Sequence, residues 1–305
     1  MKTTTQLASL STLSLVLSAC GGGGGGGGGT LPTFTSWSAI QPGSTVVATG
    51  LSQETPYAYD ESGLVIDAGQ PSSVSTTSTA TMTFDSAGDL SGLTLVTPTS
   101  KLDLGVFVDL GEGVILAANS ADPALMTSLA LIADPYFLGY EYQSFGIWET
   151  TLVGTNNAVG GVFSVGAPTA GSAIPTVGDA SFVGNLAGSY IDPGGVLWFA
   201  FADVNVNANF GTRTLTFSSA STSITDLLTP EIPRPDLDLA GTFAYQPAVN
   251  AFTGPVTSGI TGLSGSSTGR FYGPGAQELG GVFTLRSDGV ESYGGAYGAV
   301  RTPAP

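Results

Sequence analysis

Histidine is absent from the 305 residues of this chain, and cysteine occurs only once, at Cys20. Zinc, copper and histidine-ligated haem sites therefore lack their usual side chains, although tyrosine or methionine could still ligate haem iron. A disulfide within the chain is excluded because it needs two cysteines. A serine or cysteine nucleophile usually needs a histidine base, which this chain does not have. We therefore expect no metal site, no cofactor and no catalytic residue, and we expect that the chain is not an enzyme.

Basic side chains are the second scarcity: 7 Lys and Arg stand against 23 Asp and Glu, for a formal net charge of -16. Nucleic acid is not expected as a partner, because its phosphates must be neutralised by Lys and Arg. Residues 30–150 hold 13 acidic residues and one basic residue, Lys101, whereas residues 151–305 hold 10 acidic residues and five arginines. The acidic first half either faces a basic partner or keeps the protein soluble, and the sequence leaves both interpretations open.

Two short patterns resemble functional motifs. Residues 265–269 fit the Gly-x-Ser-x-Gly pattern of a nucleophile elbow, but without a histidine base we interpret them as a flexible loop. Residues 203–207 (Asp-x-Asn-x-Asn) begin like a calcium loop. Ala208 then stands where that loop needs glycine and Thr214 where it needs glutamate, so we interpret the pattern as the polar face of a strand. A hydrolase that uses two carboxylates stays open as a minor alternative, since the sequence indicates no particular pair.

The first twenty residues carry a targeting signal. Lys2 precedes a short apolar stretch, Leu7–Leu17, which is too brief and too rich in serine to span a bilayer. The stretch ends in Leu-Ser-Ala-Cys20, which resembles the lipobox of bacterial lipoproteins. The resemblance implies that residues 1–19 are removed as a signal peptide and that Cys20 receives lipid on its thiol and then on its new amine. The alternative is a plain secretory signal with an incidental cysteine.

An unbroken run of glycine, Gly21–Gly29, follows the cysteine. Phosphate-binding glycine loops need a Lys or a Ser/Thr together with a flanking strand and helix, and none of these is indicated here. We interpret residues 20–29 as a lipidated cysteine followed by a flexible tether with a reach of roughly 15–20 Å. Acyl chains on Cys20 would hold the protein on a lipid bilayer.

Glycine (45 residues) and proline (18) are frequent, and short runs of β-branched and aromatic residues alternate with turn residues. This pattern predicts a mostly β fold. Residues 30–135 form the first expected unit, a β-rich domain with one helix over Pro123–Ala133 that Ser120 or Asp122 caps and Pro135 ends. Its expected strands are Ser44–Thr49, Leu64–Ile66, Thr79–Phe84, Leu93–Val96, Val106–Leu110 and Val114–Ala117.

Strand signals become more regular from Tyr136 onward, and residues 136–301 form the second expected unit. Leu215 and Phe217 alternate with threonines, and a turn at Asn209–Gly211 would join this run to the strand before it. Repeated hairpins favour a closed barrel, which removes unpaired sheet edges. Apolar residues on one strand face predict a barrel that is filled inside and soluble. The expected strands are Tyr136–Thr151, Val159–Val165, Ala180–Ile191, Val196–Asn207, Thr212–Ser219, Leu239–Tyr245, Gly269–Tyr272, Leu279–Leu285 and Ser292–Val300.

Residues 270–283 read Arg-Phe-Tyr-Gly-Pro-Gly-Ala-Gln-Glu-Leu-Gly-Gly-Val-Phe. This signature segment resembles the Gly-Phe-Tyr-Gly-Pro-x-Ala-x-Glu-x-Gly-Gly-x-Phe signature of the β-barrel domain of transferrin-binding protein B and its relatives. Residues 298–301 resemble the end of that domain, and residues 209–216 resemble one of its hairpins. The resemblance covers roughly residues 136–301 and implies a soluble eight-stranded antiparallel β-barrel, preceded at residues 30–135 by the handle-like domain of the family.

Relatives in this family bind host transferrin, haemoglobin, haem carriers or complement regulators. The resemblance therefore implies a lipoprotein displayed on the outer membrane that binds a nutrient- or iron-related ligand, protein or small molecule, for a TonB-dependent transporter. A surface-lipoprotein translocator is a further expected partner. Transferrin-binding protein B has two handle-and-barrel lobes, whereas this chain has room for one and no lysine after Lys101, so the ligand and its contact residues stay unknown. A structural or adhesive surface module without a nutrient ligand is the alternative function.

The signature segment also carries structural expectations. Gly280–Gly281 would begin a strand where one backbone passes close to another. Glu278 is either a ligand contact or a structural acceptor for nearby backbone N–H groups or for Arg301, and we favour the structural role. The expected barrel core residues of this region are Phe271, Phe283 and Leu285.

Lipidation at Cys20 is the first testable prediction. Metabolic labelling with palmitate should mark the wild-type chain and leave Cys20→Ala unlabelled, because the chain has no other thiol. Equal label in the two proteins would show that the cysteine is not the lipid attachment site.

Overall fold

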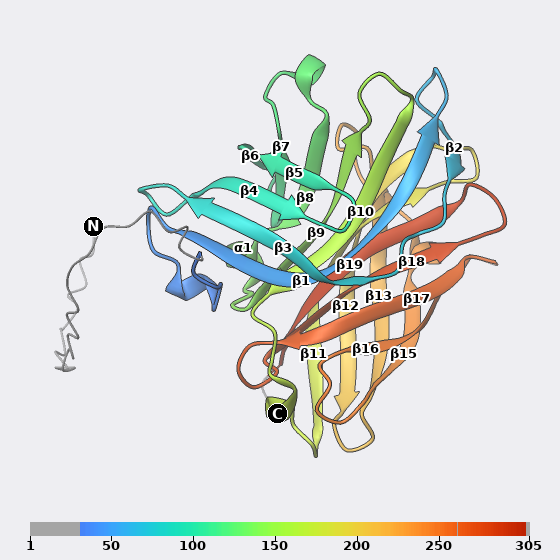
Figure 1. Cartoon of the computed structure of the whole chain (residues 1–305). Coiled ribbons are helices and arrows are strands. Elements are labelled where there is room, and N and C mark those ends of the chain that lie inside the picture. Colours follow the sequence, from blue (N-terminus) through green and yellow to red (C-terminus); the bar gives the residue numbers. More distant parts are fainter. Residues whose placement is uncertain (1–30, 261, 303–305) are drawn as a thin grey trace, which may run out of the picture. The chain divides into compact units, whose positions relative to one another are not determined.

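The computed structural model describes residues 31–260 and 262–302. The expected signal peptide, Cys20 and the glycine tether lie outside these described residues. Within them, no helix is both long and apolar enough to cross a membrane. From Leu31 onward the chain folds as a single unit of two antiparallel sheets, shown in Figure 1.

The first sheet comprises ten strands from residues 45–166. Nine follow the order β5-β4-β3-β1-β10-β9-β8-β7-β6, and β2 pairs with β1 beside them. The end strands β5 (Lys101–Leu104) and β6 (Val106–Asp109) are separated only by Gly105, so the sheet curls almost into a closed barrel. Its other strands are β1 (Thr45–Tyr59), β2 (Val65–Ala68), β3 (Ser75–Phe84), β4 (Leu90–Val96), β7 (Val114–Ala118), β8 (Ser128–Ala133), β9 (Gln143–Thr151) and β10 (Asn157–Gly166).

The second sheet is a closed barrel of eight antiparallel strands. Their order is β12-β11-β19-β18-β17-β16-β15-β13, and the pairing of β12 with β13 closes the ring. A short strand, β14 (Ile232–Pro233), pairs with β13 outside the ring. The predicted eight-stranded barrel is thereby confirmed. Its strands are β11 (Asp179–Ile191), β12 (Leu197–Asn209), β13 (Thr214–Thr225), β15 (Leu239–Tyr245), β16 (Phe252–Ser258), β17 (Ser264–Tyr272), β18 (Glu278–Arg286) and β19 (Ser292–Arg301).

Helical structure is limited to single turns in the described part of the chain. These are η1 (Trp37–Ala39), η2 (Pro123–Leu125), α1 (Pro135–Leu138), η3 (Gly171–Ala173) and η4 (Pro235–Leu237).

Alternating side chains fill the barrel as the sequence predicted. Leu215 and Phe217 are buried in the interior, whereas Thr216 and Ser218 on the opposite face are exposed. Phe271 lies at the centre of an aromatic cluster, with ring centroids 5.5–6.3 Å from those of four neighbours. Offset and edge-on aromatic contacts of this kind stabilise a core beyond the burial of their apolar area. The three core predictions of the signature region are confirmed, since Phe271, Phe283 and Leu285 are each 1% exposed.

The expected boundary between the two units lies at the wrong place. Residues 136–151 and 159–165 were assigned to the barrel, but β9 pairs with β8, and β10 pairs with β9 and β1, all within the first sheet. The barrel begins only at Asp179. Strand propensity predicts only that a segment is extended. Which sheet the strand joins depends on its pairing partner, which can lie far away in the sequence. Here Thr49 pairs with Gly166, across more than a hundred residues.

The predicted helix over Pro123–Ala133 is also wrong. Only Pro123–Leu125 forms a single 3-10 turn, which Asp122 caps as expected, and Ser128–Ala133 is strand β8. Five of the six side chains of β8 are buried, because both faces of the strand are covered. A short run that is apolar on both faces has no period by which a strand can be distinguished from a helix.

The first sheet packs its apolar surface against the outer wall of the barrel. Strands β9 and β10 contact β18 and β19, and Figure 1 shows the green and red strands side by side. A shared apolar cluster fills this contact; its buried members include Leu51, Leu131, Phe145, Ile147, Val162, Ala187, Val282 and Ala296. Since the barrel interior is a separate cluster, the molecule has a core between its sheets as well as one inside the barrel.

Gly280 should not tolerate a side chain at this contact. A Cβ at this position would lie 2.1 Å from Gln143 Oε1 and 2.8 Å from the carbonyl oxygen of Tyr297. We expect Gly280→Ala to lower the free energy of unfolding by about 1–3 kcal/mol, the usual cost of overpacking. Urea titration would measure the change. Gly289→Ala is the matched control, because nothing lies within 4 Å of its Cβ, and an equal loss in both variants would contradict the prediction.

Candidate functional site

The signature segment lies where the barrel meets the first sheet. It covers the end of β17, a tight turn and most of β18. The turn is tied to the end of the first sheet, since the N–H of Gly273 donates to the carbonyl of Ala167 at 2.8 Å and the hydroxyl of Thr169 donates to the carbonyl of Gly273 at 2.6 Å. The hydroxyl of Tyr272 donates to the carbonyl of Ser164 at 2.9 Å. The conspicuous sequence of this segment therefore serves the joint between the two sheets.

Glu278 is the central polar group of this joint. Its side chain is 1% exposed, and its carboxylate accepts hydrogen bonds from the backbone N–H groups of Glu141 at 2.6 Å and Tyr142 at 3.1 Å. These two residues precede β9 of the first sheet. The geometry supports the structural interpretation of Glu278 as an acceptor for backbone N–H groups, and the acceptor role does not involve Arg301.

Burial also controls the protonation of Glu278. Loss of water around the carboxyl group raises its pKa to about 7, and the neighbouring Glu141 carboxylate adds to the rise. The N–H donors of Glu141 and Tyr142 act in the opposite direction, because they stabilise the charged form. Desolvation is the larger effect, so the carboxyl group titrates near neutral pH.

Further hydrogen bonds between the sheets surround Glu278. Gln143 is fully buried and donates through Nε2 to the carbonyl of Leu279 at 2.8 Å, while its backbone carbonyl accepts from Trp37 Nε1 at 2.9 Å. The hydroxyl of Tyr140 donates to the carbonyl of Gly298 at 2.8 Å and accepts from the N–H of Asn185 at 3.2 Å. These side chains satisfy buried backbone groups, as buried polar groups must, and are not presented to a ligand.

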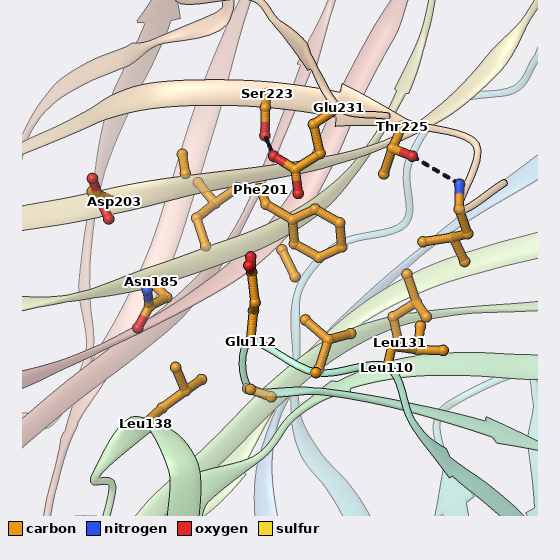
Figure 2. A pocket seen from close by; sticks show the side chains of 18 of the residues that line it. Leu110, Glu112, Leu131, Leu138, Asn185, Phe201, Asp203, Ser223, Thr225 and Glu231 are labelled. Atoms are coloured by element: carbon orange, nitrogen blue, oxygen red, sulfur yellow. Dashed lines mark hydrogen bonds between the residues drawn. The ribbon is translucent and has the colours of Figure 1, made fainter. Parts of the chain in front are cut away.

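A cleft of about 610 Å³ opens beside this joint (Figure 2). On one side the β6–β7 turn and β8 line it; on the other side β11, β12, β13 and the loop after β13 line it. Tyr140 connects the joint to the cleft, because Asn185, to which it is hydrogen-bonded, is one of the lining residues. The volume is that of a typical small-molecule site.

The lining of the cleft combines an apolar floor with an acidic rim. The floor includes the half-buried side chains of Val114, Leu138 and Phe201, and the rim carries the carboxylates of Glu112 and Glu231. Asp203 is a third lining carboxylate, and none of the described residues that line the cleft is a lysine or arginine. The cleft therefore combines a negatively charged rim with an apolar base.

Unusual backbone conformations gather around the cleft. Of six non-glycine residues with positive φ among the described residues, three line it: Glu112 (φ 53°), Ser221 (φ 59°) and Leu227 (φ 67°). The register of β12 and β13 also shifts between Phe201 and Asp203, opposite Ser221. A non-glycine residue in the left-handed region costs energy and is found most often in turns and functional sites.

Sequence reasoning named only one of the cleft residues, Asp203, and assigned it to the polar face of a strand. The structure confirms that face, since Asp203, Asn205 and Asn207 are exposed on β12. The interpretation of residues 265–269 as a flexible loop is wrong, because they lie within strand β17, where Ser267 is buried and donates to the carbonyl of Val282 at 3.0 Å. No local pattern marks the cleft, because its lining comes from segments between residues 110 and 231.

The fold and the cleft define a β-barrel lobe with a ligand-sized opening at its side. Residues 174–301 match the family model of the C-lobe and N-lobe beta barrels of Tf-binding protein B. All eight strands of the closed barrel lie in this range. This part of the chain is therefore a transferrin-binding protein B-like β-barrel domain, as the signature segment indicated.

Solved structures of transferrin-binding protein B are similar to a larger part of the chain. A variant from Haemophilus parasuis is 19% identical with a TM-score of 0.49, over 84% of this chain and 46% of its own. The protein from serogroup B Neisseria meningitidis is 17% identical with a TM-score of 0.44, over 83% of this chain and 44% of its own. A variant from Actinobacillus pleuropneumoniae is 14% identical with a TM-score of 0.45, over 84% of this chain and 100% of its own. The chain thus spans less than half the length of the first two structures, and no curated protein sequence matches it.

Glu278 should make stability depend on pH. Its pKa rises from the ordinary value to about 7 on folding, so the folded state favours the protonated form. The resulting stabilisation is complete below the unfolded pKa of about 4.3 and is lost as the pH rises through 7. We expect the free energy of unfolding of the wild type to fall by about 2–3 kcal/mol more than that of Glu278→Gln between pH 4.5 and 7.5.

Denaturant titrations across this pH range would test the prediction. Glu61→Gln is the control, because Glu61 is an exposed carboxylate away from the joint and should keep the wild-type slope. Parallel stability curves for the wild type and Glu278→Gln would show that burial of Glu278 does not raise its pKa.

Proposed function

We propose that this chain is a lipoprotein displayed on the outer membrane that binds a nutrient- or iron-related ligand for an outer-membrane transporter. The observation that carries the proposal is the transferrin-binding protein B-like barrel domain over residues 174–301, with a ligand-sized cleft between its outer wall and the first sheet. The relatives in the structural comparison are named for binding transferrin. For this chain the ligand is not identified, because the chain covers less than half the length of these relatives.

Binding fits the side chains better than catalysis does. The buried polar cluster around Glu278 links the two sheets through hydrogen bonds to backbone groups, and the Glu278 side chain is shielded from solvent. The cleft presents carboxylates, hydroxyl groups and apolar side chains, an arrangement suited to ligand recognition. We therefore propose that the protein is a binding protein and not an enzyme.

Anchoring and partners follow from the N-terminal residues. Acyl chains on Cys20 would insert in the bilayer, and the nine glycines Gly21–Gly29 would let the folded unit stand away from it. A TonB-dependent transporter would take up the ligand, and a surface-lipoprotein translocator would bring the protein to the outside. A structural or adhesive module without a nutrient ligand is the competing function, and the test below separates the two.

Surface display can be tested on intact cells that express the full chain. External protease should degrade the wild type and not Cys20→Ala, because only the acylated protein would be held on the outer face. Protection of the wild type until the outer membrane is permeabilised would contradict surface display.

Ligand capture can be tested with the same cells. Affinity purification of the tagged wild-type chain should recover a TonB-dependent transporter or a tightly bound nutrient. A chain that mediates attachment of cells and recovers neither would support the adhesive function instead.

A further inference from the structure

We propose that the cleft between the β6–β7 turn and the barrel wall binds a small amphipathic cation, that is, an ammonium or guanidinium group carried on an apolar chain. This inference rests on the proposed binding function and names the ligand class and the site. It is carried by the shape of the cleft, by its apolar floor and by the sign of its charges.

The floor of the cleft provides for the apolar part of the ligand. Val114 and Leu138 contribute half-buried apolar surface on one side of the cleft, and on the other side Phe201 adds an aromatic ring that is only partly buried. Such surface gains about 25 cal/mol for each Å² that a ligand removes from water. Beside the cleft an open groove continues over Val183 and Val300, so an apolar chain has a path to extend along.

The charges of the cleft provide for the cationic part. Figure 2 shows Glu112 on the β6–β7 turn and Glu231 on the loop after β13, with both carboxyl groups directed into the cleft beside the ring of Phe201. The two groups belong to opposite walls, and Asp203 adds a third negative charge. Like charges that face one another across a cleft repel, and a cation between them removes the repulsion.

Basic side chains of the described residues are placed elsewhere. Lys101 pairs with Asp103 at 2.7 Å, Arg234 pairs with Asp236 at 2.7 Å, and Arg286 donates to the carbonyls of Ala68 and Gly69. None of the lining residues is a lysine or arginine. An anionic ligand such as a fatty acid or a phosphate would therefore meet only negative charge in the cleft.

The turn that carries Glu112 does not need the glutamate side chain for its own structure. The turn is closed by backbone hydrogen bonds between Leu110 and Val114 and between Val114 and Gly111, and by the Asp109 carboxylate, which accepts from the N–H of Gly111 at 2.8 Å. Glu112 adopts φ 53° there, where glycine would be less strained. Its carboxylate is thus left to face the cleft, as Figure 2 shows.

Three probes of equal chain length can test the proposal: octyltrimethylammonium, 1-octanol and octanoate. Binding to the full chain with Cys20→Ala would be measured by calorimetry, because this chain carries no acyl group that could itself occupy the cleft. We expect the cation to bind at least about tenfold more tightly than octanoate, and added salt to weaken the preference. Glu112→Gln with Glu231→Gln should lower the affinity for the cation roughly tenfold and raise that for octanoate.

Glu61→Gln with Asp67→Asn is the matched control, because it removes two exposed carboxylates outside the cleft. Thermal melting of each variant would show that its fold is intact. Equal binding of the three probes, or the same affinities in both double variants, would overturn the proposal. If the cleft fails this test while cells still capture a transporter or nutrient, the binding function stands and its site lies elsewhere.

Discussion

The buried carboxylate of Glu278 is the interaction on which the joint between the two sheets depends. A carboxylate removed from water is costly unless donors surround it, and here the donors are backbone N–H groups at the start of β9. Glu278, a side chain of the barrel, thereby accepts hydrogen bonds from backbone N–H groups just before β9 that are not paired with another strand. Either partner without the other would leave a buried polar group unpaired, so the two sheets are coupled more tightly than apolar contact alone would require.

Two glycines, one in β18 and one in β19, are required by the same close contact between the sheets. Gly280 and Gly298 leave room for Gln143 and Phe145, because a Cβ at either position would meet these side chains at less than 3 Å. The side chains that fill this room belong to the apolar and polar contacts between the sheets. A segment that stands out in the sequence as a possible ligand motif is therefore explained by the close packing of one sheet on another.

The cleft is a consequence of how the joint is placed. The first sheet is held against β18 and β19, whereas the β6–β7 turn faces β12 and β13 across a space that side chains leave unfilled. Tyr140 lies between the two regions and is hydrogen-bonded to both β19 and β11. A ligand in the cleft would therefore contact residues from both sheets, and changes in the joint would alter the cleft.

Local residue patterns determined the mostly β fold, the closed barrel, the buried face of Leu215 and Phe217 and the core role of Phe271, because alternation and turn residues act over a few positions. The lipobox at Cys20 is likewise a local pattern, and it stays a prediction. Tertiary structure alone decided that β9 and β10 belong to the first sheet and that Ser128–Ala133 is a strand covered on both faces. It also brought Glu112, Asp203 and Glu231 to one cleft from segments far apart in the chain. Strand pairing and cavities depend on which distant segments of the chain come into contact. A local residue pattern extends over a few positions only, so it cannot specify these contacts.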